Sequence, residues 1–136
     1  MKKLITYDPE IQMAYLYVIP FTSEIGIEST EELEENPKLN VDIDQFDRIV
    51  GIGFFGENAS KLKELTNKSK IYIKKTSNDN KCIYSFRLSQ DNHLQKVAFH
   101  HVVFYFADNQ YEEFIGFDIM KPSLYGYDIL NSLSEY

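Results

Sequence analysis

The segment Ile49–Phe55 constrains the fold more than any other part of the chain, because its apolar side chains alternate with glycine. The alternating apolar positions are Val50, Ile52 and Phe54. Successive residues of a β-strand point to opposite faces of a sheet, so this pattern predicts a strand with one apolar face. Gly51 and Gly53 leave its other face nearly bare, which lets a backbone or an aromatic ring approach closely.

Three more strands are predicted in the first half of the chain, where β-branched and aromatic residues are bounded by turn-forming ones. These strands are Leu4–Tyr7, Met13–Ile19 and Val41–Asp44. In the second strand, the alternation predicts a core face made of Ala14, Leu16 and Val18. Asn58 can cap a helix that closes this unit. The inward positions of that helix are Ala59, Leu62 and Leu65.

The acidic segment from Ser23 to Asn40 is the least regular part of the sequence. Ile25 and Ile27 indicate a brief edge strand within it. The run Ser29-Thr30-Glu31-Glu32 fits a capping box, in which a hydroxyl and a carboxylate satisfy the first N–H groups of a helix. We therefore expect one helical turn here, ended by Pro37.

The second half repeats the pattern of strands followed by a helix. The predicted strands are Ile71–Lys74, Cys82–Leu88, Val97–Ala107 and Tyr111–Met120. The third is long, and His100-His101 is a candidate position for a bulge in it. Pro122 or Ser123 can open a last helix, which Gly126 should weaken by about 1 kcal/mol relative to alanine. The shared face of that helix would be Tyr127, Leu130 and Leu133.

The hairpin of residues 41–54 is similar to that of residues 104–119, and each is followed by a helix start at a similar distance. Two explanations stay open: a duplication packed about a pseudo-two-fold axis, or a chance likeness of two hairpins with glycine in the return strand. The expected fold class is α+β, with two antiparallel β-sheet-plus-helix units at residues 1–66 and 67–136. We expect both units to pack as one globular domain around a shared core.

Four motifs stand in a fixed order in the first half. They are Tyr7-Asp8-Pro9-Glu10, Ala14-Tyr15-Leu16-Tyr17, Val41-Asp42-Ile43-Asp44 and Ile49-Val50-Gly51-Ile52. Together they resemble the small YuzE-like bacterial domain of unknown function, over roughly residues 3–65. The second half would then be a degenerate duplicate. The resemblance implies a small sheet with a packed helix, and it implies no reaction, because the family has no established activity.

Composition and charge narrow the classes of function. The net charge of −7 disfavours nucleic-acid binding, which depends on Lys and Arg, although Lys61 to Arg87 is a locally basic stretch. Cys82 is the only cysteine, which excludes an intramolecular disulfide and favours a reducing compartment. The N-terminus does not resemble a signal peptide, and no run approaches the ~20 apolar residues of a membrane span. We expect a cytoplasmic protein without membrane contact.

Carboxylates at Asp42, Asp44 and Asp47 are the best candidates for a metal site, since hard cations prefer several oxygen ligands. They lack the ordered spacing and the glycine of an EF-hand loop, and an exposed strand face accounts for them equally well. We therefore predict no metal site and no cofactor.

Three histidines, His93, His100 and His101, lie within nine positions. Adjacent strand residues point to opposite faces, so His100 and His101 should not share a metal ion. Cys82 alone supplies too little thiolate for a structural zinc site, and no oxyanion hole accompanies it for nucleophilic catalysis. We assign no catalytic residue.

The strongest candidate for function is an acidic, partner-binding surface. Its charged members are Glu28, Glu31, Glu32, Glu34 and Glu35, and nearby Tyr15 and Tyr17 would be suitable anchors. We predict a non-catalytic module that binds a basic protein. An example is an immunity protein or antitoxin, which would inhibit a basic nuclease toxin. Two alternatives stay open: a ligand-binding protein or enzyme with an aromatic pocket between the halves, and a self-associating structural protein that forms a homodimer.

Overall fold

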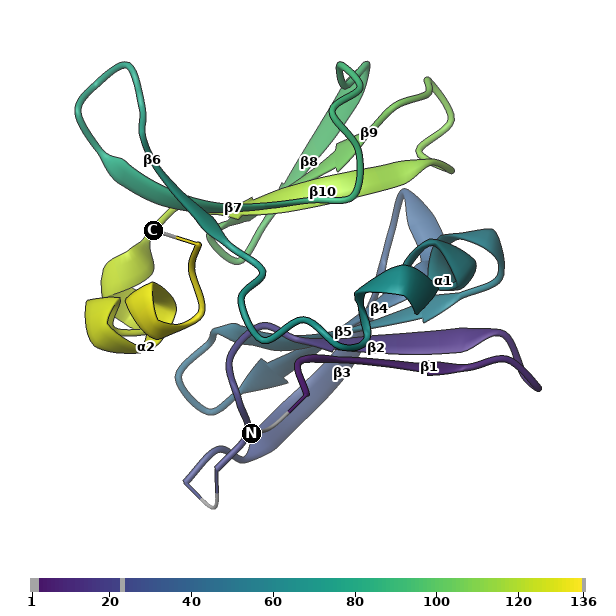
Figure 1. Cartoon of the computed structure of the whole chain (residues 1–136), viewed down its shortest axis with the longest axis horizontal. Coiled ribbons are helices and arrows are strands. Elements are labelled where there is room, and N and C mark those ends of the chain that lie inside the picture. The colour runs from purple at the N-terminus through teal and green to yellow at the C-terminus, as the bar shows by residue number, and fades with distance from the viewer. Residues whose placement is uncertain (1–2, 23, 136) are drawn as a thin grey trace. The chain divides into compact units, whose positions relative to one another are not determined.

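The computed structural model describes residues 3–22 and 24–135, and the chain divides into two compact units, Met1–Ser69 and Lys70–Tyr136 (Figure 1). Each unit consists of one five-stranded antiparallel sheet with short helical segments. The expected class, α+β, therefore fits only loosely: two sheet units are present, but each α-helix has at most six residues.

The sheet of unit 1 has the strand order β1-β2-β5-β4-β3. The strands are β1 (Ile5–Asp8), β2 (Met13–Tyr17), β3 (Ile27–Leu33), β4 (Asn36–Asp44) and β5 (Ile49–Phe55). A short helix, α1 (Glu57–Lys61), follows β5 and contacts β2 and β5, and a 3₁₀ turn, η1 (Lys63–Leu65), completes the unit. Because β5 is central, it pairs with β2 on one side and β4 on the other.

The sheet of unit 2 has the order β6-β7-β10-β9-β8. Its strands are β6 (Ile73–Thr76), β7 (Cys82–Arg87), β8 (Gln95–Phe99), β9 (Val102–Phe106) and β10 (Phe114–Ile119). A 3₁₀ turn, η2 (Pro122–Leu124), and a helix, α2 (Tyr127–Ser132), follow β10. The two units thus have the same order of strands and the same connections, which is the arrangement that a duplicated unit predicts.

The inward faces form apolar cores as the alternation predicts. In unit 1, the residues predicted to point inward from residues 13–19 and from β5 are all buried, namely Ala14, Leu16, Val18, Val50, Ile52 and Phe54. In unit 2 the corresponding positions of β7, β9 and β10 carry mainly aromatic side chains. These are Tyr84, Phe86, Phe104, Phe106 and Phe117, all buried.

The predicted helical turn at residues 29–32 is wrong. Residues 27–33 form edge strand β3, in which Thr30 pairs with Asp42 and Glu32 with Asn40. The prediction failed because the local Ser-to-Glu capping pattern yields to ladder pairing with the long strand β4. The strand also gives no apolar alternation, since both of its faces are exposed as far as Glu32.

The single strand predicted at residues 97–107 is also wrong. The chain instead forms the hairpin β8–β9, and His100 and His101 are the two turn residues, with φ of 49° and 66°. Positive φ at both central positions is the mark of a type I′ turn, which twists in the same sense as its flanking strands. Histidine is among the residues that adopt this conformation more readily, but it is not the usual signal for it.

The predicted helix caps need correction as well. Asn58 does not cap α1; it lies buried inside the helix, and Gly56 occupies the cap position. Gly126 does not weaken the interior of α2, because it precedes the helix at φ 99°, where glycine is favoured.

Candidate partner-binding surface

The five predicted partner-binding glutamates lie on one edge hairpin of unit 1. Glu28, Glu31 and Glu32 are on β3, and Glu34 and Glu35 form the turn that leads into β4. All five are exposed, and none of them takes part in an ion pair among the described residues. The buried side chain of Leu33 fixes the end of the strand against the core. We call the segment of residues 27–35, which consists of β3 and this turn, the acidic edge.

Tyr15 and Tyr17 lie on the outer face of the same sheet, opposite the core. Their rings meet edge to face at a centroid distance of 4.8 Å, and the Phe21 ring contacts Tyr17 at the same distance. Aromatic pairs prefer this arrangement because the positive edge of one ring meets the negative face of the other. The three rings form a half-buried aromatic group on the outer face.

Hydrogen bonds join the aromatic group to the acidic edge. The Tyr15 hydroxyl donates to Asp42 on β4 at 2.5 Å, and the hydroxyl of Thr30 on β3 donates to the other carboxylate oxygen at 2.5 Å. The Tyr15 ring reaches across β5 because Gly51 has no Cβ; a Cβ there would collide with the phenol. Burial, and then the hydrogen bond to Asp42, raise the pKa of Tyr15 far above its ordinary value, so this phenol is a donor throughout the physiological range.

The outer face of unit 2 carries a different polar group. Asp118 on the central strand β10 accepts hydrogen bonds from Ser85 at 2.6 Å, Arg87 at 2.9 Å and Tyr105 at 2.8 Å. Burial alone would raise the pKa of Asp118, but these bonds outweigh it and hold the pKa below its ordinary value. Burial and the bond to Asp118 raise the pKa of Tyr105 to about 12. The carboxylate is therefore ionised and fully engaged, as in a structural cluster.

The predicted candidates for a metal site are separated by a β-bulge between Asp42 and Ile43. Asp42 accepts hydrogen bonds from the hydroxyls of Tyr15 and Thr30. Asp44 instead points into the β4–β5 turn, where it accepts hydrogen bonds from the backbone N–H groups of Phe46 and Arg48. In the described part of the chain, no three His, Cys, Asp or Glu side chains converge as metal ligands would.

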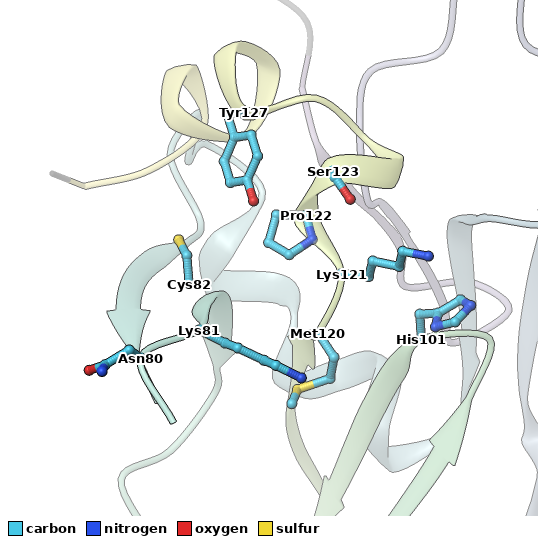
Figure 2. Close-up of a pocket in the computed structure, with 9 residues that line it drawn as sticks. All are labelled: Asn80, Lys81, Cys82, His101, Met120, Lys121, Pro122, Ser123 and Tyr127. Carbon is cyan, nitrogen blue, oxygen red and sulfur yellow. The ribbon is translucent and has the colours of Figure 1, made fainter. Parts of the chain in front are cut away.

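The three histidines are also dispersed. The His93 ring contacts the Tyr105 ring in a tilted arrangement with a centroid distance of 4.7 Å, and His100 meets Phe99 edge to face at 4.3 Å. His101 lies with Cys82 along a surface groove of unit 2, which sequence reasoning missed (Figure 2). The groove is formed by residues from four segments. They are Asn80, Lys81, Cys82, His101, Met120, Lys121, Pro122, Ser123 and Tyr127.

Comparison with known proteins identifies the family to which the chain belongs. The family model "Protein of unknown function (DUF2283)" matches residues 4–57, the strands of unit 1 and the start of α1. The chain belongs to this YuzE-like family. "Uncharacterized protein YuzE" of Bacillus subtilis (strain 168) is 34% identical over 134 residues, which is 98% of this chain and 98% of that protein. The resemblance predicted for residues 3–65 is confirmed, and the match to YuzE continues through unit 2.

No solved structure matches the chain at a significant level. Across residues 3–22 and 24–135, no helix combines the length and the apolar character that crossing a membrane requires.

Proposed function

We propose that this chain is a non-catalytic cytoplasmic module that binds a basic protein through the acidic edge. One observation carries the proposal: β3 is an edge strand exposed on both faces, and it displays carboxylates that have no cationic partner among the described residues. Unpaired surface charges of one sign raise the rate at which an oppositely charged protein is captured.

The edge position of β3 suggests how the partner would be held. No strand is paired with the outer side of β3 within the described sheet, so alternate backbone N–H and C=O groups along it are available to an added strand. Because Glu31 and Glu32 point to opposite faces of the sheet, lysine or arginine on both faces of that strand would lie opposite them. The aromatic group of Tyr15, Tyr17 and Phe21 offers large, preformed contact area on the adjoining outer face.

The narrower form of the proposal is that the partner is a nuclease-type toxin and that the chain inhibits it in the manner of an immunity protein or antitoxin. Its support is the charge of −7 and the small size of the chain, which suit a protein that must cover a basic active surface.

The test begins with capture of the tagged protein from a lysate of its own cells, together with co-expression with the product of the adjacent gene. The decisive comparison is between two charge variants. The first carries Gln at the five glutamates of the acidic edge, and the second carries Gln at Glu10, Glu57, Glu64, Glu112 and Glu113. Both variants lose the same charge, so only the position of the lost charge differs.

We expect the acidic-edge variant to associate with the captured partner about tenfold more slowly at low salt, with a flatter dependence on salt. The control variant should keep most of the rate and the slope. Equal rates for both variants would contradict a role for the acidic edge, as would a partner without a basic surface. Tyr17→Ala should increase the dissociation rate if the aromatic group is an anchor.

A further inference from the structure

The groove of unit 2 differs in charge from the rest of the protein. Its lining includes Lys81, Lys121 and His101 and not one carboxylate, although the chain as a whole has a net charge of −7. The volume is about 620 Å³, which is within the usual range for small-molecule sites. A local positive region in an acidic protein concentrates anions.

Backbone hydrogen bonds hold the walls of the groove in place. The N–H of Met120 donates to the carbonyl of His101 at 3.0 Å, which fixes the β8–β9 turn against the exit of β10. Ser77 N–H donates to the carbonyl of Lys81 at 2.7 Å and closes the β6–β7 turn. The cationic side chains therefore project from fixed backbone positions, which lowers the entropic cost of binding.

The side chains divide into polar and apolar groups. Figure 2 shows the Lys81 side chain extending toward Met120, and the Lys121 and His101 side chains on the other side of Met120 in this view. The hydroxyls of Ser123 and Tyr127 add neutral donors, while Met120, Pro122 and the Tyr127 ring supply apolar area. Lys81 has an ion pair with Asp79 at 3.7 Å, but both side chains are largely exposed, and such pairs contribute little and exchange readily.

We propose that this groove binds a small phosphorylated molecule that carries a ring. The two lysines would hold the phosphate as point charges, assisted by His101 and the hydroxyls. The ring would lie against Met120 and the face of Tyr127, both of which are exposed. The groove shares no residue with the acidic edge, so this proposal and the proposed partner can each fail without the other.

The experiment is a titration of the ¹⁵N-labelled full chain with adenosine monophosphate, followed by amide chemical shifts. Adenosine, which lacks the phosphate, and inorganic phosphate, which lacks the ring, are the matched ligands. We expect saturable shifts at Lys81, Cys82, His101 and Lys121 with the nucleotide, weaker ones at the same residues with phosphate, and none with adenosine.

Two double variants locate the site. K81Q/K121Q should weaken nucleotide binding about tenfold or more, because two charge-assisted contacts are lost. K70Q/K96Q removes the same charge from exposed positions of unit 2 outside the groove and should leave binding unchanged. Nucleotide should also slow alkylation of the half-exposed Cys82 by iodoacetamide in the wild type and not in K81Q/K121Q.

Several outcomes would overturn the proposal. These are shifts that do not saturate, shifts spread over lysines outside the groove, equal effects of adenosine and its monophosphate, and unchanged binding by K81Q/K121Q. A poly-glutamate peptide that saturates the groove at lower concentration than the nucleotide would also overturn it, because the ligand would then be an acidic protein segment.

Discussion

The Tyr15 hydroxyl donates a 2.5 Å hydrogen bond to Asp42, although the central strand β5 separates the strands that carry them. The bond passes over Gly51. In unit 2 the corresponding pair is Tyr105 and Asp118, joined at 2.8 Å, but there the carboxylate is on the central strand itself. The outer face of each sheet therefore contains a tyrosine–aspartate hydrogen bond, but the two bonds join different strand positions of the shared strand order.

Replacing Gly51 should reveal the space that the Tyr15 ring occupies. Gly51→Ala should lower the free energy of unfolding by about 1–3 kcal/mol, because the new Cβ forces the phenol away from Asp42. Gly53→Ala is the matched control on the same strand and face, where the nearest atom is an ordinary 3.8 Å from the Cβ position. Urea unfolding measures both. Equal stability of the two variants would contradict the close packing, and Tyr15→Ala should remove most of the difference between them.

The Asp118 cluster should make unit 2 sensitive to acid. The pKa of Asp118 is lowered by folding, so its contribution is present above the unfolded-state pKa and is lost as the pH falls through the folded-state value. Asp118→Asn should cost about 2–4 kcal/mol at pH 7, and the difference from wild type should shrink toward pH 3. Urea unfolding at both pH values tests this, with Asp91→Asn on an exposed loop as the control. A difference that is independent of pH would exclude the ionised cluster.

The contribution of Tyr105 to stability depends on pH in the opposite direction and is lost at high pH. Its folded-state pKa of about 12 lies above the ordinary value of 10.0, so its contribution is present below pH 10 and is lost as the pH rises toward 12. Tyr105→Phe should unfold with a smaller loss of stability across this range than the wild type. Spectrophotometric titration of the phenolates near 295 nm provides an independent measurement, and a Tyr105 that ionises at its ordinary pKa would contradict the bond to Asp118.

Replacing the two histidines of the β8–β9 turn should be able to stabilise the protein. Asn-Gly favours the type I′ turn more strongly than His-His, so the double variant H100N/H101G should raise the free energy of unfolding by about 0.5–1 kcal/mol. Val-Val at the same positions should lower it, because β-branched residues resist positive φ. Hydrogen exchange of the β8 amides reports the effect locally. Faster exchange in H100N/H101G than in the wild type would show that the histidine side chains themselves stabilise the turn.

Among the carboxylates of unit 1, buried Asp44 should cause the largest loss of stability when it is replaced. It is 2% exposed, accepts two backbone N–H groups of its own turn and pairs with Arg48 at 2.8 Å. Asp44→Ala should cost about 3–5 kcal/mol, since it leaves these donors without an acceptor. Thermal unfolding measures the loss, with exposed Asp47→Ala in the same turn for comparison. A similar loss for both would show that the turn conformation, rather than the buried carboxylate, is what matters.

The strands that form the core of unit 1 could be predicted from the sequence, whereas the extent of the exposed strand β3 could not. The alternation in residues 13–18 and 49–55 identifies the core of unit 1, and the glycine face at Gly51 predicts the close approach that Tyr15 makes. Strand β3 gives no such signal, because its residues 27–32 are exposed on both sides. Its pairing depends on β4, which begins only after the turn at Glu34 and Glu35.

The site was predictable in composition but not in arrangement. The glutamate run and the two tyrosines are visible in the sequence, whereas their connection through Asp42 and Thr30 depends on strand order. The groove of unit 2 was not predictable, because its lining comes from four separate segments. One of these is the hairpin tip at His101, where the sequence predicted an uninterrupted strand.

The one-sided strand β5 also has a consequence for folding fidelity. A slip of one residue in its pairing would turn Ile52 and Phe54 to solvent and bring Gly51 and Gly53 into the core, where they would leave voids. A strand with side chains of similar size on both faces would tolerate such an error far better. The bare face therefore discriminates against misregistered intermediates during assembly of the sheet, in addition to the room it gives Tyr15 in the native state.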